Sequence, residues 1–230
     1  MKIVVLLRTR NEERNIGRFI KCYQDWVDLI LVADGGSTDR TVKMALQFNK
    51  VKVRNFVEFV ECENNIWRNP EGKHINFLID WAVQEENADW IILDDCDCFP
   101  TKALQKDGRE IIEQCAFDYI FFERLYVYHK TRYFPRLNDA GASLWSWRAG
   151  KLKADDDSIW HGGFSALGNV GKWERLNLCK PYAGLHCFAP DDEEIERKLS
   201  FYRDSGGSPN MLHPLDFGGP LEPLPDWAIS

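Results

Sequence analysis

The chain has 230 residues, of which 44% are hydrophobic and 28% charged, and its formal net charge is −7. A chain of this length can bury the core of one large domain, and the composition is that of an ordinary globular protein. An acidic chain argues against a nucleic-acid partner bound on a broad basic face. No run approaches the roughly 18 apolar residues of a transmembrane helix, and we expect no signal peptide at the N-terminus.

The seven cysteines are scattered and include no Cys-x-x-Cys pair. This spacing argues against a zinc ribbon and against a disulfide scaffold. A reducing compartment is the default for such a chain, so we expect a cytoplasmic protein. Peripheral association with a membrane and the oligomeric state are left open.

The first 56 residues predict a β-α-β-α-β unit. Residues 3–7 form a continuous aliphatic run, and residues 28–33 form another after their first residue, Asp28; such runs are typical of parallel strands that are buried on both faces. Residues 52–56 predict a shorter third strand. Strands that alternate with helices in this way predict a parallel α/β sheet. In such a sheet the ligand crevice lies at the carboxyl ends of the strands.

Capping residues predict where the two intervening helices begin. Asn11 is expected to cap the first helix, with Glu12 in the first turn, where the helix dipole favours negative charge. Ser37 or Thr38 is expected to cap the second helix, whose inward side includes Leu46.

The next segment repeats the pattern. Residues 57–72 lack periodicity and predict a loop over the crevice, followed by a helix over 73–87 and a fourth strand over 90–93. A further helix is predicted over 102–115, capped by Thr101.

The fourth strand runs directly into Asp94-Asp95-Cys96-Asp97, which places three carboxylates within four residues. Unpaired carboxylates would repel one another, and a divalent cation with oxygen ligands is the usual remedy. The second strand also ends at an aspartate, Asp34. Because parallel strands end at one edge, residues 8–10, Asp34 and the Asp95–Asp97 pair are expected along one crevice, and Asp94 is expected to be structural.

Beyond residue 117 the sequence becomes aromatic and less regular. Residues 119–128 predict a strand that pairs with 132–134, and four of the nine tryptophans lie between 145 and 173. These tryptophans suit core packing. The chain is therefore expected to comprise a regular half (1–116), a less regular half of the same domain (117–205) and an extended tail rich in proline and glycine (206–230).

Three motifs together resemble the family 2 glycosyltransferases: Arg8-Thr9-Arg10-Asn11-Glu12-Glu13, Asp34-Gly35-Gly36-Ser37-Thr38-Asp39, and Asp95-Cys96-Asp97, which resembles the Asp-x-Asp motif of the family. The resemblance covers about the first 100 residues well and the remainder loosely. It implies an α/β GT-A fold: a Rossmann-like, mostly parallel sheet with flanking helices, followed by a smaller mixed, aromatic-rich half. It also implies an enzyme that transfers a sugar from a nucleotide-diphosphate sugar, with a UDP-sugar favoured, to a hydroxyl of a glycan or lipid-linked acceptor, with inversion.

The resemblance assigns roles around a Mn²⁺ or Mg²⁺ ion. Asp97 would be the more direct metal ligand, while Asp95 would reach the ribose and metal-bound water. His186 resembles a late histidine that the family can use as a further metal ligand, although a single histidine in an apolar stretch equally suits a core position.

The resemblance makes residues 1–116 the donor-binding half and 117–205 the acceptor-binding and catalytic half, where the tryptophans would either stack against a sugar ring or pack the core. It also assigns the donor site. Asp34 resembles the acid that hydrogen-bonds the nucleobase, although its alternative role is to cap the helix after Gly36. Arg68 and Lys73 resemble basic residues beside the diphosphate, whereas His74 departs from the arginine that is common in the family. The implied donor-binding residues are Thr9, Arg10, Glu12, Asp34, Arg68, Lys73 and Asp95.

An inverting transferase needs a base that deprotonates the acceptor hydroxyl, and here the sequence departs from the family pattern. The nearest candidate is Asp157, the last residue of a triple-aspartate run, although such a run is also typical of an exposed turn. His161 could substitute for it or assist it.

Two other enzyme classes use similar motifs. A phosphohydrolase of the haloacid dehalogenase type would use Asp95 as its nucleophile, but that family expects the motif at its first strand and Thr or Val where this chain has Phe99. A nucleotidyltransferase on a similar sheet would need a glycine-rich first loop, and residues 8–10 contain no glycine.

Overall fold

The structure is a computed structural model. It describes residues 1–57, 60–62, 66–68, 71–128, 132–133, 144–154, 164–166, 175–189, 191–193, 196, 200 and 222–226. In chain order the elements are β1 (Ile3–Thr9), α1 (Ile16–Tyr23), β2 (Leu29–Asp34), α2 (Thr41–Ala45), β3 (Val51–Asn55), β4 (Val60–Cys62), β5 (Ile66–Arg68), α3 (Glu71–Asp80), the π-helical turn η2 (Trp81–Glu85), β6 (Trp90–Asp95), β7 (Cys98–Pro100), α4 (Lys102–Gln114), β8 (Tyr119–Tyr128), β9 (Arg132–Tyr133), β10 (Leu144–Arg148), β11 (Leu152–Ala154), β12 (Phe164–Ala166), β13 (Arg175–Ala189) and β14 (Glu222–Pro223).

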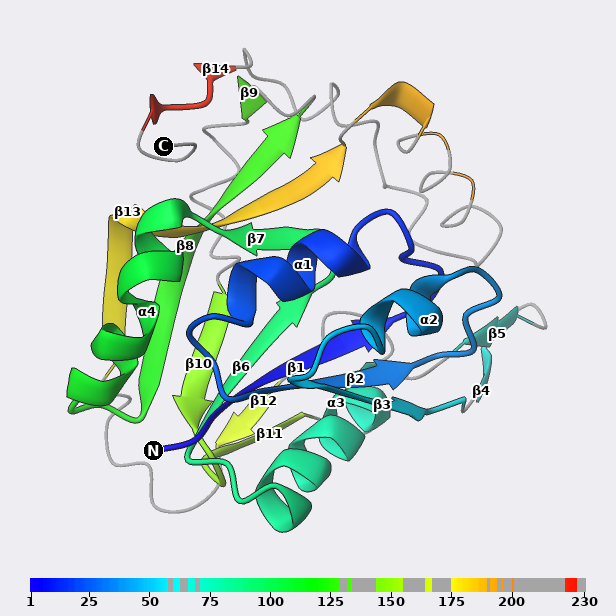
Figure 1. The fold of residues 1–230 in the computed structure, drawn as a ribbon, viewed down its shortest axis with the longest axis horizontal. Helices are drawn as coiled ribbons and strands as arrows, with labels where there is room; N and C mark the ends of the chain where they lie inside the picture. Colours follow the sequence, from blue (N-terminus) through cyan, green and yellow to red (C-terminus); the bar gives the residue numbers. More distant parts are fainter. Residues whose placement is uncertain are drawn as a thin grey trace.

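One large sheet forms the centre of the molecule (Figure 1). Its first four strands lie in the order β3-β2-β1-β6 and are all parallel. Strand β10 then pairs antiparallel with both β6 and β8, and β13 runs parallel to β8. The predicted mostly parallel α/β sheet is confirmed, and the strands of the aromatic half extend it.

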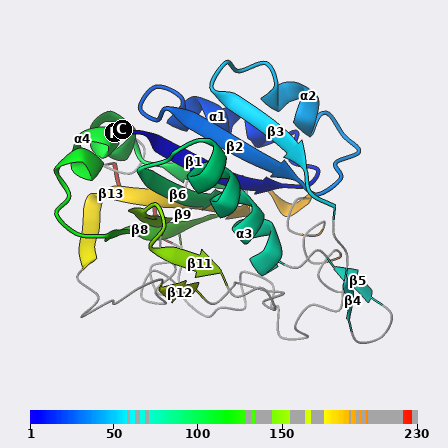
Figure 2. The ribbon, with the colours of Figure 1, turned by 90° about the horizontal axis from the view of Figure 1, so that it is seen from below.

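Helices cover both faces of the parallel strands, which explains the continuous aliphatic runs in the sequence. Ile3, Val5 and Leu7 of β1 pack in one cluster with α1 and α4, whereas Val4 and Leu6 pack in a second cluster with α3. Figure 2 shows α1 and α2 on one side of the sheet and α3 on the other. Each fully buried aliphatic side chain contributes about 1.5–3 kcal/mol to folding, so the strand ends are held by a rigid scaffold.

The prediction that Asn11 caps the first helix is wrong. Helix α1 begins only at Ile16, with Asn15 at the capping position, and Asn11 has a left-handed φ of 57°. The Asn11 side chain instead accepts a 2.8 Å hydrogen bond from the backbone N–H of Thr38. Asn11 therefore ties the loop after β1 to the loop after β2, a partnership that local sequence does not reveal.

The start of the second helix is also corrected. Arg40 is the capping residue of α2, and the side chain of Asp39 accepts a 2.9 Å hydrogen bond from the backbone N–H of Thr41. Helix α2 is only five residues long, and Leu46, expected to face inward, is 60% exposed. The short helix ends before Leu46 can reach the core.

The segment predicted as a loop at 57–72 contains an antiparallel pair, β4 with β5. Helix α3 begins at Glu71, two residues earlier than expected. Thr101 does cap α4, because its hydroxyl accepts a hydrogen bond from the backbone N–H of Leu104. The predicted pairing of 119–128 with 132–134 is seen as β8 against β9. In the described part of the chain, no helix has the length and apolarity that crossing a membrane requires.

Candidate functional site

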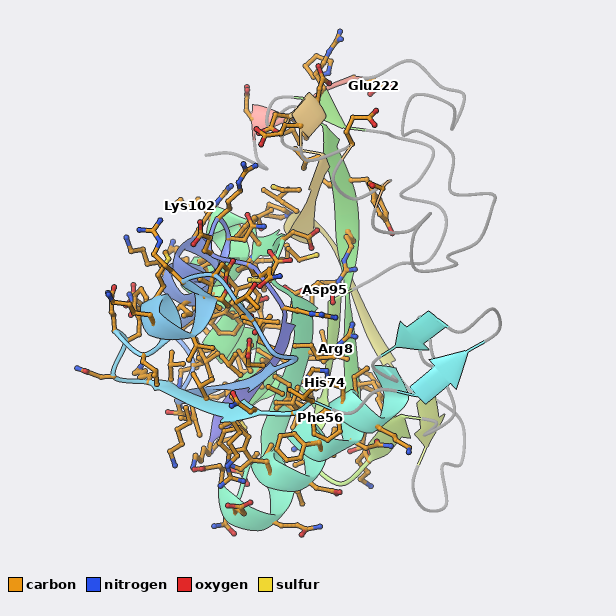
Figure 3. All side chains as sticks on the ribbon, turned by 90° about the vertical axis from the view of Figure 1, so that its right-hand side faces the viewer. Arg8, Phe56, His74, Asp95, Lys102 and Glu222 are labelled. Carbon is orange, nitrogen blue, oxygen red and sulfur yellow. The ribbon has the colours of Figure 1, made fainter. Side chains whose placement is uncertain are left out.

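The carboxyl ends of β1, β2 and β6 meet at one edge of the sheet, as expected. The strand register sets Thr9 beside Asp34 and Arg8 beside Asp95. Figure 3 shows Asp95, Arg8, His74 and a further labelled residue, Phe56, following one another along this edge. The residues predicted from three separate strands therefore form one row.

The end of β6 carries two carboxylates with different surroundings. Asp94 is 3% exposed; its Oδ2 accepts a 2.6 Å hydrogen bond from the Tyr23 hydroxyl, and its Oδ1 lies 3.1 Å from Nη2 of Arg124. The side chain of Asp95 is 46% exposed and lies between two guanidinium groups, 3.3 Å from Arg8 Nη2 and 3.8 Å from Arg124 Nη1. Asp94 therefore anchors the strand end, and Asp95 is the carboxylate that faces the crevice.

Burial raises the pKa of Asp94 to about 7, while Arg124 and the Tyr23 hydroxyl act in the opposite direction. Arg124 contacts both carboxylates of β6 from the neighbouring half of the sheet, on β8. Arg124 was not predicted as a site residue. The feature of the sequence that points to it is its charge inside the aromatic, strand-forming run 119–128, because the interior of a strand rarely holds an unpaired charge.

The backbones of the residues predicted as metal ligands run close to one another where β6 turns into β7. The backbone carbonyl of Asp97 accepts a 2.8 Å hydrogen bond from the N–H of Cys187, and the register pairs His186 with Cys98. The backbone of His186 therefore runs beside the residue that follows Asp97, whereas its side chain lies outside the described part. Among the described residues, no group of three His, Cys, Asp or Glu side chains is placed to hold a metal ion.

The donor set suits a hard cation better than a soft one. Asp95 and Asp97 supply carboxylate oxygens, which Mn²⁺ and Mg²⁺ prefer. The neighbouring thiols of Cys96 and Cys98 are buried, and burial raises their pKa well above the usual value. Burial therefore disfavours the thiolate form of both side chains, which are also small enough to pack at the strand end.

The environment of Asp34 differs from that of Asp95. It is 2% exposed, and its carboxylate accepts hydrogen bonds from the backbone N–H groups of Gly36 (3.1 Å) and Ser37 (2.9 Å). The hydroxyls of Ser37 and Thr9 donate to its other oxygen. Gly36 adopts a φ of 86°, which permits this tight turn. Asp34 thus holds the turn after β2 together, and its role toward a nucleobase stays a prediction.

The loop after β1 lies against the loop after β2. Thr9 is buried through its contact with Asp34, while Arg10 is exposed. The backbone N–H of Glu12 donates a 2.7 Å hydrogen bond to the Thr41 hydroxyl, and the side chain of Glu12 accepts one of 2.9 Å from Asn15. The predicted donor-binding roles of Thr9, Arg10 and Glu12 remain predictions.

His74, which stood out in the sequence only because the family commonly has arginine there, lies in the row of residues along the sheet edge. Its Nε2 lies 3.0 Å from the carbonyl oxygen of Ala33, so Nε2 carries the proton, and its ring stacks on Phe56 with centroids 4.9 Å apart. Burial lowers the pKa of His74 to about 4, and the charge of Arg8 acts in the same direction. His74 is therefore neutral at physiological pH.

The remaining predicted residues are less fully described. Lys73 lies half-buried on α3, next to His74. Arg68 lies on β5, with its side chain outside the described part. Asp157 and His161, the two candidate bases, lie outside the described residues altogether.

Comparison with known proteins decides the family. The model of the family described as glycosyl transferase family 2 matches residues 4–184. The chain belongs to glycosyl transferase family 2. This family membership confirms the resemblance seen in the sequence and the predicted enzyme class, and it leaves the phosphohydrolase and nucleotidyltransferase alternatives without support. No curated protein matches the sequence.

Solved structures of this family share the fold. S. aureus TarS (residues 1–349) is 16% identical with a TM-score of 0.53, and the match covers 89% of this chain and 65% of TarS. The same protein in complex with UDP is 15% identical with a TM-score of 0.51, covering 79% of this chain and 62% of TarS. Glucosyl-3-phosphoglycerate synthase from Mycobacterium tuberculosis, in complex with Mn²⁺, UDP and phosphoglyceric acid, is 15% identical with a TM-score of 0.51, covering 90% of this chain and 79% of the synthase.

The chain thus spans less than two thirds of the TarS chains that it matches. At these identities the likeness concerns the fold, and it confirms the predicted GT-A architecture.

Proposed function

We propose that this chain is a metal-dependent glycosyltransferase that moves a sugar from a nucleotide-diphosphate sugar to a hydroxyl group with inversion at the anomeric carbon. A UDP-sugar is the favoured donor, and a glycan or lipid-linked molecule is the favoured acceptor. The observation that carries the proposal is the half-exposed Asp95, followed by Asp97, at the strand-end edge of a family 2 sheet. Two structural neighbours were solved with UDP, one of them also with Mn²⁺.

Asp95 and Asp97 would hold Mn²⁺ or Mg²⁺, with His186 as a third ligand. The ion would offset the charge that develops on the leaving diphosphate. Arg8 lies 3.3 Å from Asp95 and keeps that carboxylate aimed along the edge. Its guanidinium would offer further donors to a phosphate, because an arginine fork can serve two acceptors at once.

The nucleoside would lie toward Asp34 and Thr9, with Arg10 and Glu12 in the adjoining loop and with Arg68 and Lys73 near the diphosphate. The acceptor would be bound by residues 117–205, and the extended tail would comprise 206–230. Asp157, with His161 assisting, would remove the proton from the acceptor hydroxyl. The new bond then forms from that oxygen to the anomeric carbon as the bond to the diphosphate oxygen breaks on the opposite side. A cytoplasmic location and peripheral membrane association complete the proposal.

Titration calorimetry with a panel of nucleoside diphosphates, with and without Mn²⁺, tests the proposal. UDP should bind in a metal-dependent way, and Asp97→Ala should weaken that binding by about 10- to 100-fold or more, because even the loss of a group that only supports a metal ligand has an effect of this size. Asp25→Ala, which removes an exposed carboxylate in the turn after α1, is the matched control. Metal-independent binding in the wild type, or full binding by Asp97→Ala, would falsify the metal site.

A further inference from the structure

A groove lies on the face of the sheet that carries α1 and α4. Its volume is about 610 Å³, and it runs between these two helices and reaches β7 and β13. That volume is in the range of small-molecule sites rather than of a single water or ion. None of the residues discussed for the donor site lines it. Figure 3 shows Lys102 on this side, apart from the row formed by Asp95, Arg8 and His74.

Four cationic side chains line this α1–α4 groove: Arg14, Arg18, Lys21 and Lys102. None of the described residues that line it is acidic. This is a local excess of positive charge in a chain whose net charge is −7, so it is not the background of a basic protein. The groove therefore has a local positive potential in a chain that is acidic as a whole.

Among the described residues, most of that charge has no ion-pair partner. Arg14 is paired with the exposed Glu193 at 3.1 Å. In the part of the chain that the structure describes, Arg18, Lys21 and Lys102 have no ion-pair partner. Three cations therefore remain for a ligand, a number suited to a group with two or more negative charges.

Arg18 and Lys102 line the same side of the α1–α4 groove. The guanidinium of Arg18 lies over the ring of Phe99, 4.0 Å from its centroid, which fixes one face of the group and leaves its N–H edge open to an anion. Lys102 is the first residue of the 13-residue helix α4, whose dipole adds positive potential there. Both cations act on the half-buried thiol of Cys22 and oppose the rise in its pKa that burial causes.

We propose that the α1–α4 groove is a second anion-binding site, which takes a phosphate-bearing ligand and works separately from the donor crevice. The inference does not depend on the proposed function, because it rests on other residues. A soluble phosphate ester and the headgroup of an anionic phospholipid share the required chemistry. Charge-driven binding of either should weaken as the ionic strength rises.

Cys22 allows the site to be probed directly, because it lines the groove and is half-exposed, whereas Cys96, Cys98, Cys115 and Cys187 are buried. Alkylation of the full chain is followed by mass spectrometry at Cys22, with inorganic pyrophosphate, glycerol phosphate, or vesicles of phosphatidylglycerol or phosphatidylcholine. A soluble probe at ten times its Kd should slow alkylation about tenfold. Protection by phosphatidylglycerol vesicles alone would identify a lipid headgroup, and protection by the soluble probes would identify a soluble phosphate.

Lys21→Gln/Lys102→Gln should weaken the protecting ligand about tenfold or more, since two charged donors are lost. Lys43→Gln/Lys106→Gln is the matched control, because it removes two exposed charges from α2 and α4 outside the groove. Metal-dependent UDP binding should be unchanged in both variants. The inference is overturned if no probe protects Cys22, if both double variants lose protection equally, or if phosphatidylcholine protects as well as phosphatidylglycerol.

Discussion

Strands β2 and β6 both end in aspartate at the same edge of the sheet, yet the two carboxylates have different environments. Asp34 is enclosed by neutral donors, namely backbone N–H groups and hydroxyls of its own and the adjacent loop. Asp95 is half-exposed and faces the guanidinium groups of Arg8 and Arg124. A strand-to-aspartate junction therefore specifies a position, and the neighbouring strands decide whether that position builds a turn or presents a charge.

The largest effect is expected from removing the arginine that distinguishes the β6 junction. Arg124→Leu leaves the buried Asp94 without its ionic partner, and breaking a buried pair in this way costs about 3–5 kcal/mol of stability. Urea unfolding measures the loss. Arg40→Leu, which removes an exposed ion pair with Glu13, should leave the unfolding midpoint almost unchanged.

Adding Asp94→Asn to Arg124→Leu should restore part of the loss, because the uncompensated carboxylate is then absent. Equal unfolding free energies for Arg124→Leu and Arg40→Leu would show that the β6 junction does not depend on its buried ion pair.

A pH-dependent effect is expected beside the β2 junction. The pKa of His74 is about 4 in the folded chain, whereas the ordinary value, which applies to the unfolded chain, is 6.5. Between pH 4 and 6.5 the unfolded chain therefore binds a proton at His74 that the folded chain does not. The contribution of His74 to stability should therefore fall as the pH drops below about 6.5, by up to roughly 3 kcal/mol near pH 4, whereas Asp94, whose pKa is raised to about 7, acts in the opposite direction over the same range. The difference in unfolding free energy between the wild type and His74→Gln isolates the histidine and should change with pH by this amount, as measured by urea unfolding at pH 7, 6, 5 and 4. An unchanged slope in the variant would assign the loss to other groups.

A smaller but more diagnostic effect separates the two aspartates. Asp34→Ala should cost about 1–3 kcal/mol of stability, because it leaves hydrogen-bond donors in and beside a buried turn without an acceptor. Asp95→Ala should change stability by no more than about 1 kcal/mol, because its ion pair with Arg8 is partly exposed. Thermal unfolding of both variants beside metal-dependent UDP binding provides the test. If Asp95→Ala is the more destabilised of the two, the contrast between a turn-building and a charge-presenting aspartate is wrong.

The sequence by itself determined the parallel sheet and the positions of its carboxylates. Continuous aliphatic runs report burial on both faces, and parallel strands must end at a common edge, so the placing of Arg8, Asp34 and Asp95 follows from local patterns. The family motifs added the enzyme class, which the match over residues 4–184 confirms.

Only the tertiary structure decided what each charged group contacts. Arg124 contacts Asp94 of β6 although it lies 30 residues further along the chain. Asn11 accepts a hydrogen bond from the loop after β2 instead of capping the helix that follows it. Hydrogen bonds and ion pairs depend on distance in space, and periodicity carries no information about partners far apart in sequence. The α1–α4 groove arises in the same way, because Arg18 and Lys102 share a wall only after α1 and α4 have packed on the same face of the sheet.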